Sequence, residues 1–217
     1  SYSVTGVQTC ALPISPFKKF VVKALDKIAP LAVDYVLTGH GPVVDSSNYQ
    51  AVTQMYREWS KPKEVNEHPL IVIPYASAYG YSKKMADAVS EGIRKSFDTL
   101  VEIEAYDLVE TPVSLVVERI RQADAFLMAT TTILSDAVEP IWEVLIRLNP
   151  VMDGGKFASA FGSYGWSGEG VVNVMTRLKQ LRMKTLEGLR IKFNPSVDQL
   201  QECVQFGFAF GSFMQGK

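Results

Sequence analysis

Three short segments of the chain combine hydroxyl side chains, glycine and aromatic rings. They run over Ser77–Ser82, Thr130–Asp136 and Ser163–Gly170, and each follows an apolar run typical of a strand. Hydroxyls and backbone N–H groups at the start of a helix can hold a phosphate, aided by the helix dipole. Gly80 allows the backbone to approach such a group without a Cβ in the way. The residue types therefore predict a phosphate-binding site.

The aromatic residues of these segments indicate what the phosphate is attached to. Tyr79, Tyr164 and Trp166 could stack on a flat ring, and an aromatic pair is worth about 0.5–1.5 kcal/mol beyond area burial. Neutral donors can satisfy a buried dianion, so the neighbouring Lys83 and Lys84 are interpreted as a solvated helix face. The segments contain no nucleophile–base pair, paired carboxylates or Walker lysine. A cofactor that carries its own redox chemistry explains them better than an amino-acid catalyst.

Alternating strands and helices from Pro69 onward must position these segments. The predicted strands are Leu70–Tyr75, Val101–Tyr106, Ala125–Thr130, Phe157–Ser163 and Leu186–Phe193. The predicted helices are Ser82–Phe97, Ser114–Gln122, Pro140–Leu148, Gly170–Leu181 and Val197–Phe213. This alternation predicts an α/β fold, a doubly wound five-stranded parallel sheet with helices on both faces. Ligands of such sheets bind beyond the carboxyl ends of the strands, where the three segments converge.

The first 68 residues follow a different pattern. A helix is predicted over Pro16–Ile28, a short strand over Ala32–Leu37 and a second helix from Asn48. The polar segment 61–68, which contains Pro62, is the best candidate for a linker. The expected organisation is a first structured segment over residues 16–60, a linker at 61–68 and a domain over 69–217.

The beginning of the chain is set apart from the fold. The stretch VTGVQTCALPI, Val4–Ile14, resembles the translation of a widely used sequencing adapter. We therefore expect residues 1–15 to be artefactual and the chain to be a fragment of a longer protein, and we exclude this segment from fold prediction. Cys10 falls within it, which leaves Cys203 as the remaining thiol. Two cysteines do not form a disulfide framework, and the composition predicts a cytoplasmic protein.

Composition excludes several classes of function. The 217 residues are 47% hydrophobic and 21% charged, with a formal net charge of −1, which argues against nucleic-acid binding. No apolar run approaches the roughly 18 residues of a membrane helix. The chain has two histidines, His40 and His68, which limits any metal site.

Longer stretches around the three segments are similar to a known family. YASAYGYSKKMADAVSEGI, TTTILSDAVEPIWEVL and FASAFGSYGWSGEGV resemble the flavodoxin domain of flavodiiron proteins, also called A-type flavoproteins. The resemblance covers Ser15–Lys217 and implies a flavodoxin-like sheet with strand order 2-1-3-4-5. LTGHGPV and YREWS resemble the end of that family's metallo-β-lactamase-like domain, so residues 16–60 are expected to be its truncated remnant.

The resemblance implies that FMN binds at the three segments. Its phosphate is expected at Ser77, Ala78, Tyr79, Gly80, Tyr81 and Ser82. Its ribityl chain and isoalloxazine are expected at Thr130, Thr131, Thr132, Ile133, Ser163, Tyr164, Gly165, Trp166, Ser167 and Gly168. No catalytic residue is assigned. The family's FMN passes electrons to a di-iron centre that reduces O2 to water or NO to N2O.

The same resemblance implies a metal ligand and partners for the intact parent. His40 matches the last histidine ligand of the di-iron site, but the H-x-E-x-D-H cluster is absent, so this fragment is not expected to hold iron. The expected electron donor is rubredoxin or a flavin/NADH reductase. The expected assembly is a head-to-tail homodimer or tetramer.

Two other functions share this fold. An NAD(P)H:quinone oxidoreductase would need a nicotinamide pocket, and no segment resembles one. A cofactor-free binding or signalling module of the receiver type would need an acidic pair after the first strand, where the chain has Tyr75 and Ala76. An FMN-dependent electron-transfer domain therefore remains the favoured hypothesis.

Overall fold

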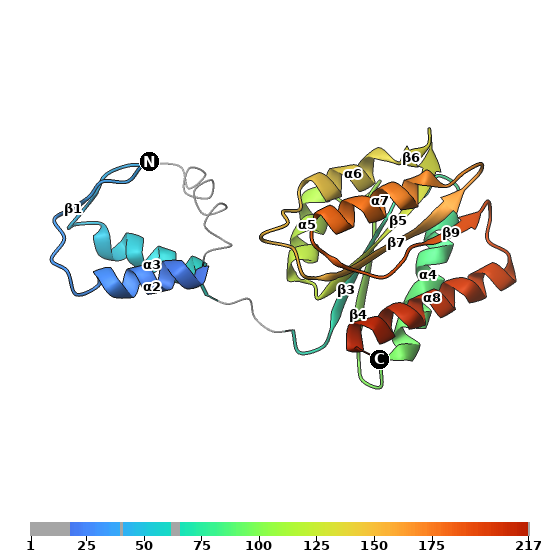
Figure 1. Ribbon diagram of the computed structural model, residues 1–217, viewed down its shortest axis with the longest axis horizontal. Coiled ribbons are helices and arrows are strands. Elements are labelled where there is room, and N and C mark those ends of the chain that lie inside the picture. Colours follow the sequence, from blue (N-terminus) through green and yellow to red (C-terminus); the bar gives the residue numbers. More distant parts are fainter. Residues whose placement is uncertain (1–17, 40, 62–65, 217) are drawn as a thin grey trace. The chain divides into compact units, whose positions relative to one another are not determined.

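The chain divides into two compact units, residues 1–64 and 65–217 (Figure 1). The computed structural model describes residues 18–39, 41–61 and 66–216. The boundary between the units falls within the segment 61–68, which we interpreted as a linker. The adapter-like residues 1–15 lie outside the described residues, so that interpretation stays a prediction.

The described part of the first unit contains two helices and a small sheet. Helices α2 (Lys18–Ile28) and α3 (Tyr49–Trp59) contact each other, and Arg57 Nη1 lies 2.8 Å from Asp26 Oδ1. The strand predicted over Ala32–Leu37 is reduced to β1 (Tyr35–Val36), which pairs antiparallel with β2 (Val44–Asp45). Both predicted helices are confirmed. Their assignment to a metallo-β-lactamase-like remnant stays a prediction.

The second unit is the predicted five-stranded parallel sheet. Four of its strands are β4 (Glu102–Asp107) at one edge, β3 (Leu70–Tyr75), β5 (Ala125–Ile133) and β7 (Phe157–Tyr164), hydrogen-bonded in that order. The position beside β7 is divided between β8 (Lys184–Thr185) and β9 (Leu189–Lys192), which both pair with β7 in parallel. The order confirms the predicted 2-1-3-4-5 topology, while the fifth strand is shorter than the predicted Leu186–Phe193.

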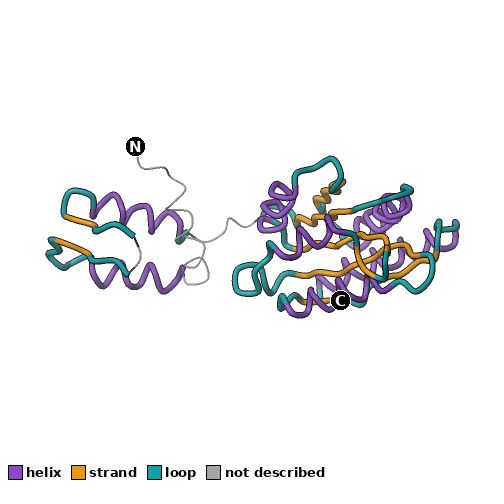
Figure 2. The backbone as a smooth tube through the Cα atoms, turned by 90° about the horizontal axis from the view of Figure 1, so that it is seen from above, coloured by secondary structure: helices purple, strands orange, loops and turns teal. Residues whose placement is uncertain are grey.

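Helices cover both faces of this sheet (Figures 1 and 2). Helices α4 (Tyr81–Ser96) and α8 (Val197–Gln215) pack on one face. The other face is covered by α5 (Val113–Gln122), α6 (Glu139–Ile146) and α7 (Glu169–Gln180). These five helices match the predicted ones to within a few residues at their ends.

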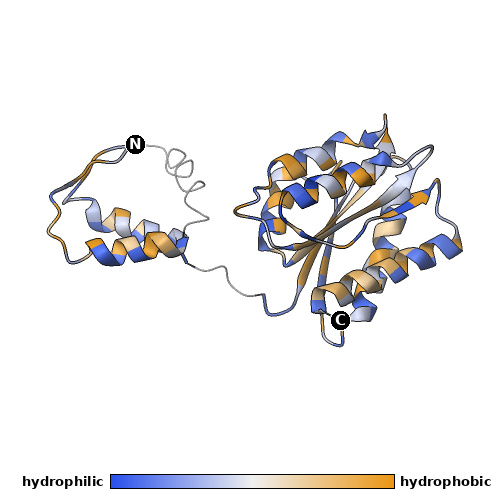
Figure 3. Ribbon diagram, in the orientation of Figure 1, coloured by the Kyte–Doolittle hydropathy of each residue, from blue (hydrophilic) through white to orange (hydrophobic). Residues whose placement is uncertain are grey.

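The strand β3 shows why the sheet needs two layers of helices. Leu70 and Val72 belong to the core beneath α5, α6 and α7, whereas Ile71 and Ile73 belong to the core beneath α4 and α8. All four side chains are almost fully buried, so the strand is apolar along this length (Figure 3). A parallel strand buried on both faces is expected to lack polar alternation.

One predicted loop is wrong. Thr130–Ile133 do not leave the sheet but extend β5, which then turns at Leu134 and Ser135 and pairs antiparallel with β6 (Asp136–Ala137). Threonine and isoleucine are β-branched and favour strands. Leu134 and Ser135 have φ of 51° and 61°, as a two-residue type I′ hairpin requires. The usual glycine or asparagine is absent there, which hid the turn from sequence inspection.

Candidate functional site at the carboxyl edge of the sheet

The first predicted segment forms the connection from β3 to α4. Gly80 is the N-cap residue of α4 with φ of 76°, a left-handed conformation that glycine adopts without steric cost. No side chain caps the helix, and no acidic residue lies in its first turn. The N–H groups at the beginning of a helix have no partners within the helix. This end of α4 is therefore suited to an anion.

Buried hydroxyl groups lie in the same part of the molecule. The side-chain oxygens of Ser77, Ser82 and Thr132 are buried without a hydrogen-bond partner among the described residues. Ser82 is 0% exposed. A buried polar group left unpaired costs about 1–3 kcal/mol, so native proteins retain few of them. These three hydroxyls have donor and acceptor capacity that the fold itself does not use.

Other predicted hydroxyls have partners within the protein. Thr130 is completely buried, and its hydroxyl donates to the Thr131 carbonyl and accepts from the Val138 N–H. Ser167 donates to Glu169 Oε2 at 2.7 Å, which lowers the pKa of that carboxyl. The hydroxyls of Thr130 and Ser167 therefore serve local structure, in contrast to those of Ser77 and Ser82.

The third predicted segment is divided between a strand and a loop. Ser163 and Tyr164 are the last residues of β7, and the loop itself is residues 165–168. Gly168 is the N-cap residue of α7 and has a φ of 72°. A Cβ on Gly168 would lie 2.9 Å from the nearest carbon of the Tyr164 ring. Glycine is thus required at this position for both conformation and space.

Two aromatic side chains of these segments are exposed. Trp166 is 92% exposed and Tyr79 is 80% exposed. Tyr79 also lies beside Tyr81, with ring centroids 5.8 Å apart. The hairpin residue Leu134 is 95% exposed. Exposed apolar groups that form a patch are typical of binding sites, whereas single exposed apolar residues do not indicate a site.

The sheet brings the three segments to one edge. The Ala76 N–H donates to the Ala129 carbonyl at 3.0 Å, and Thr131 is aligned with Ser163. A Cβ on Gly162 would lie 1.8 Å from the Thr130 carbonyl oxygen, so glycine allows β5 and β7 to approach closely here. The segments follow β3, β5 and β7, which are adjacent strands. The predicted convergence at the carboxyl edge therefore follows from the topology.

A fourth segment at this edge was missed by the sequence analysis. The Phe193 N–H donates to the Tyr164 carbonyl at 2.8 Å, directly before the loop that carries Trp166. Asn194 accepts from Lys84 Nζ at 3.3 Å, in the first helical turns of α4. The Asn194–Pro195 dipeptide is a turn signal after a strand and could have indicated this segment.

Lys83, a charged residue near the site, is paired, and the described residues show no metal centre. Lys83 Nζ lies 2.9 Å from Asp87 Oδ2, and this hydrogen bond raises the pKa of the lysine. Within the described ranges no group of three metal-ligating side chains occurs, and none of the described helices could cross a membrane. His40, the predicted parental iron ligand, lies outside the described residues.

Comparisons with known proteins identify the family. The family model described as Flavodoxin matches residues 73–207. The chain is 38% identical to flavo-diiron protein FprA2 of Clostridium acetobutylicum over 198 residues, covering 90% of the chain and 49% of that protein. It is 38% identical to type A flavoprotein fprA of Rhodobacter capsulatus over 205 residues, covering 93% and 47%. The chain thus spans about half the length of these relatives.

A solved structure shows the same fold. The flavodiiron protein from Giardia intestinalis superimposes with a TM-score of 0.69 at 21% identity, covering 94% of the chain and 49% of that structure. The chain therefore belongs to the flavodoxin family, as a flavodoxin domain homologous to the C-terminal part of flavodiiron proteins.

Proposed function

We propose that residues 65–217 bind FMN at the carboxyl edge of the sheet and act as an electron-transfer domain. The observation that carries this proposal is the pair of buried, unpartnered hydroxyls of Ser77 and Ser82 beside the uncapped start of α4. They offer donors to a phosphate where the helix dipole also favours one. The exposed rings of Tyr79 and Trp166 supply stacking surface for an isoalloxazine.

The predicted residues then take different parts in the proposed site. Ser77–Ser82 hold the phosphate through hydroxyls and the N–H groups of the first turn of α4. The ends of β5 and β7, Thr131–Ile133 and Ser163–Gly168, contact the ribityl chain and ring. Thr130 and Ser167 contribute position and backbone groups, because their hydroxyls are engaged elsewhere. FMN itself supplies the one- and two-electron redox chemistry.

In the longer protein, this domain would relay electrons to a di-iron centre that reduces O2 or NO. The relatives named as flavo-diiron and type A flavoproteins support that role, since they match nearly the whole chain. The proposal includes rubredoxin or a flavin/NADH reductase as electron donor. It also includes a head-to-tail homodimer or tetramer of the intact protein.

The substitution Ser82→Ala tests the phosphate site through two quantities, the stability of the flavin-free protein and its affinity for FMN, which should not fall together. Removing a buried hydroxyl that has no partner is expected to leave the flavin-free protein equally stable or up to about 1 kcal/mol more stable. The same change removes a hydrogen bond to a charged group, so FMN should bind at least about tenfold more weakly. Thermal unfolding without flavin and FMN fluorescence titration give the two quantities.

Ser90→Ala on the same helix is the matched control. Ser90 is also buried, but its hydroxyl donates to the Ala86 carbonyl at 2.7 Å. FMN affinity should therefore be unchanged in this variant. Equal effects of the two substitutions on FMN binding would contradict the assignment, as would a colourless wild-type chain that ignores added FMN. Rapid reduction of the bound flavin by NAD(P)H without a partner protein would favour a quinone oxidoreductase instead.

A further inference from the structure

The turn after β9 is hydrogen-bonded to two parts of the candidate site, the end of β7 and the beginning of α4. We propose that Phe193 is a positioning residue of this site, which braces the loop 165–168 and so determines where the Trp166 ring stands. This inference rests on the proposed FMN function, because Trp166 is assigned there as a stacking partner. It adds a residue that belongs to none of the three predicted segments.

The backbone of Phe193 is bonded to the residue directly before the Trp166 loop, and its ring lies beside the first residue of that loop. Its N–H donates to the Tyr164 carbonyl, two residues before Trp166. Its ring stands beside Gly165, with the nearest ring carbon 3.4 Å from the position that a Cβ on Gly165 would occupy. The loop is therefore supported where its chain leaves β7, and Trp166 itself has no covering side chains, being 92% exposed.

The conformation of Phe193 is unfavourable for its residue type. Its φ is 59°, in the left-handed region that is sterically unfavourable for a residue with a Cβ. Its side chain is 56% exposed, so little burial offsets this cost. Strained backbone is concentrated at functional sites, where the surrounding structure enforces it. Glycine or asparagine would be the better residue for the turn alone.

The same turn also reaches the phosphate side of the site. Asn194 accepts a hydrogen bond from Lys84 Nζ, which extends from the beginning of α4. Lys84 Nζ also lies 6.0 Å from the centre of the Tyr81 ring. The turn therefore links the first turns of α4 to the Trp166 loop, and Phe193 is the member that touches that loop.

The decisive variants are Phe193→Gly and Phe193→Asn, which relieve the backbone conformation and remove the ring. The flavin-free proteins should melt no lower than wild type. FMN should bind about five- to tenfold more weakly, because the stacking ring is no longer held in place. The visible circular dichroism of bound FMN should change as well, whereas Phe193→Tyr should restore both binding and spectrum.

Arg182→Gly is the matched control. Arg182 is exposed and also has a positive φ, of 60°. It lies just before β8, whose first residue is aligned with the first residue of β7. Arg182 is therefore at the amino edge of the sheet, opposite the candidate site. It should leave FMN binding and the flavin spectrum unchanged. Wild-type affinity and spectrum in both Phe193 variants, or an equal loss in Arg182→Gly, would overturn the inference. Failure of the wild-type chain to bind FMN would instead overturn the proposed function.

Discussion

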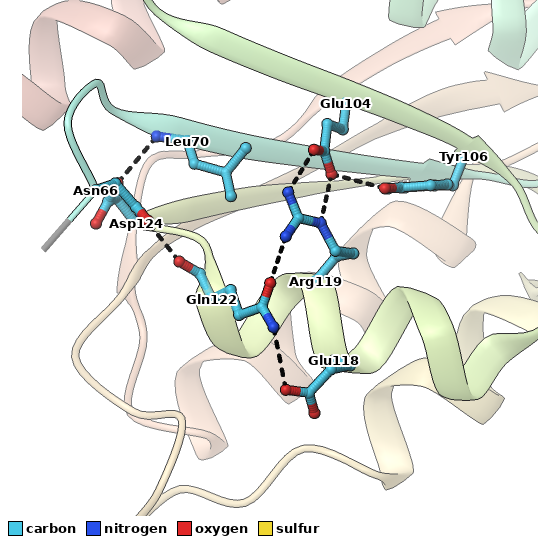
Figure 4. Close-up of polar contacts among 8 residues, drawn as sticks. All are labelled: Asn66, Leu70, Glu104, Tyr106, Glu118, Arg119, Gln122 and Asp124. Carbon is cyan, nitrogen blue, oxygen red and sulfur yellow. Dashed lines mark hydrogen bonds and ion pairs between the residues drawn. The ribbon is translucent and has the colours of Figure 1, made fainter. Parts of the chain in front are cut away.

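At the scale of single residues, a polar cluster on the edge strand β4 links stability to pH. Arg119 on α5 donates through Nε to Glu104 Oε2 at 2.9 Å, and Tyr106 donates to the same oxygen (Figure 4). The hydrogen bond from Arg119 is the main reason that the pKa of Glu104 lies below its ordinary value of 4.5. The cluster joins β4, an edge strand of the sheet, to the helix α5.

The depressed pKa of Glu104 gives a stability prediction with a defined sign. The unfolded state takes up the proton first as pH falls, so the contribution of Glu104 is present above about pH 4.5 and is lost below it. Glu104→Gln should therefore destabilise by about 1 kcal/mol near neutral pH, and the difference from wild type should shrink as pH falls through that range. Urea unfolding at several pH values measures this.

The exposed Glu102 on the same strand provides the control for this experiment. Glu102→Gln removes an exposed carboxylate from the same strand and should change stability little. A Glu104→Gln difference that stays constant down to about pH 3, or grows, would show that the ion pair does not cause the pH dependence.

The individual site residues illustrate what residue types can and cannot predict. The hydroxyl and aromatic content identified the segments, but Ser82 and Ser167 have the same side chain and opposite situations. Ser82 is buried without a partner, and Ser167 is bonded to Glu169. Whether a serine hydroxyl has a hydrogen-bond partner in the protein depends on the residues that the tertiary structure places beside it. Phe193 was missed because its contact with the Trp166 loop is long-range and its own segment contains no glycine.

At the scale of elements, the two helices on one face of the sheet are in unusually close contact. A Cβ on Gly207 of α8 would lie 2.1 Å from the Val89 carbonyl oxygen of α4, and Gly92 of α4 faces the Val204 carbonyl in the same way. Backbone atoms cannot yield as a flexible side chain can. The glycines therefore determine how deeply α8 packs against α4, the helix that begins at the proposed phosphate site.

Gly207→Ala is expected to destabilise the domain by about 1–2 kcal/mol. Overpacking costs roughly 1–3 kcal/mol, and alanine recovers up to about 1 kcal/mol through its better helix propensity. Thermal or urea unfolding measures the change. Gln205→Ala, at an exposed position of the same helix, should be neutral or slightly stabilising. A gain of stability in Gly207→Ala would mean that α4 and α8 separate at little cost.

Helices and strands were predicted well where the spacing of apolar residues is regular. They were predicted poorly where the pairing of one strand with another determines the structure. The five helices of the second unit and strands β3, β4, β5 and β7 follow from apolar spacing. The β5–β6 hairpin does not, since its turn at Leu134 and Ser135 lacks the residues that usually adopt positive φ. The division of the last strand into β8 and β9 depends on two separate registers with β7. Neither register is encoded in local residue types.

At the scale of the whole molecule, the two units differ in the core that each contains. In the second unit, buried apolar side chains form one cluster on each face of the sheet. In the described part of the first unit, Leu25 and Val44 are the buried apolar side chains. Large apolar residues are instead exposed there, namely Phe20, Leu31, Tyr35, Leu37, Val43 and Met55. Hydrophobic burial is the main stabilising term in folding, so the first unit should be the less stable.

Limited proteolysis should therefore separate the two units. Trypsin should cleave first after the lysines and arginines of residues 18–61, because regions with few buried contacts open at low free energy. A fragment beginning close to Val65 should persist and bind FMN with an affinity within about twofold of the intact chain, since the proposed site lies wholly in the second unit. Mass spectrometry of a digestion time course and FMN titration of the purified fragment measure both. First cleavage inside α4, at Lys83 for example, would show instead that the flavodoxin domain depends on residues before it.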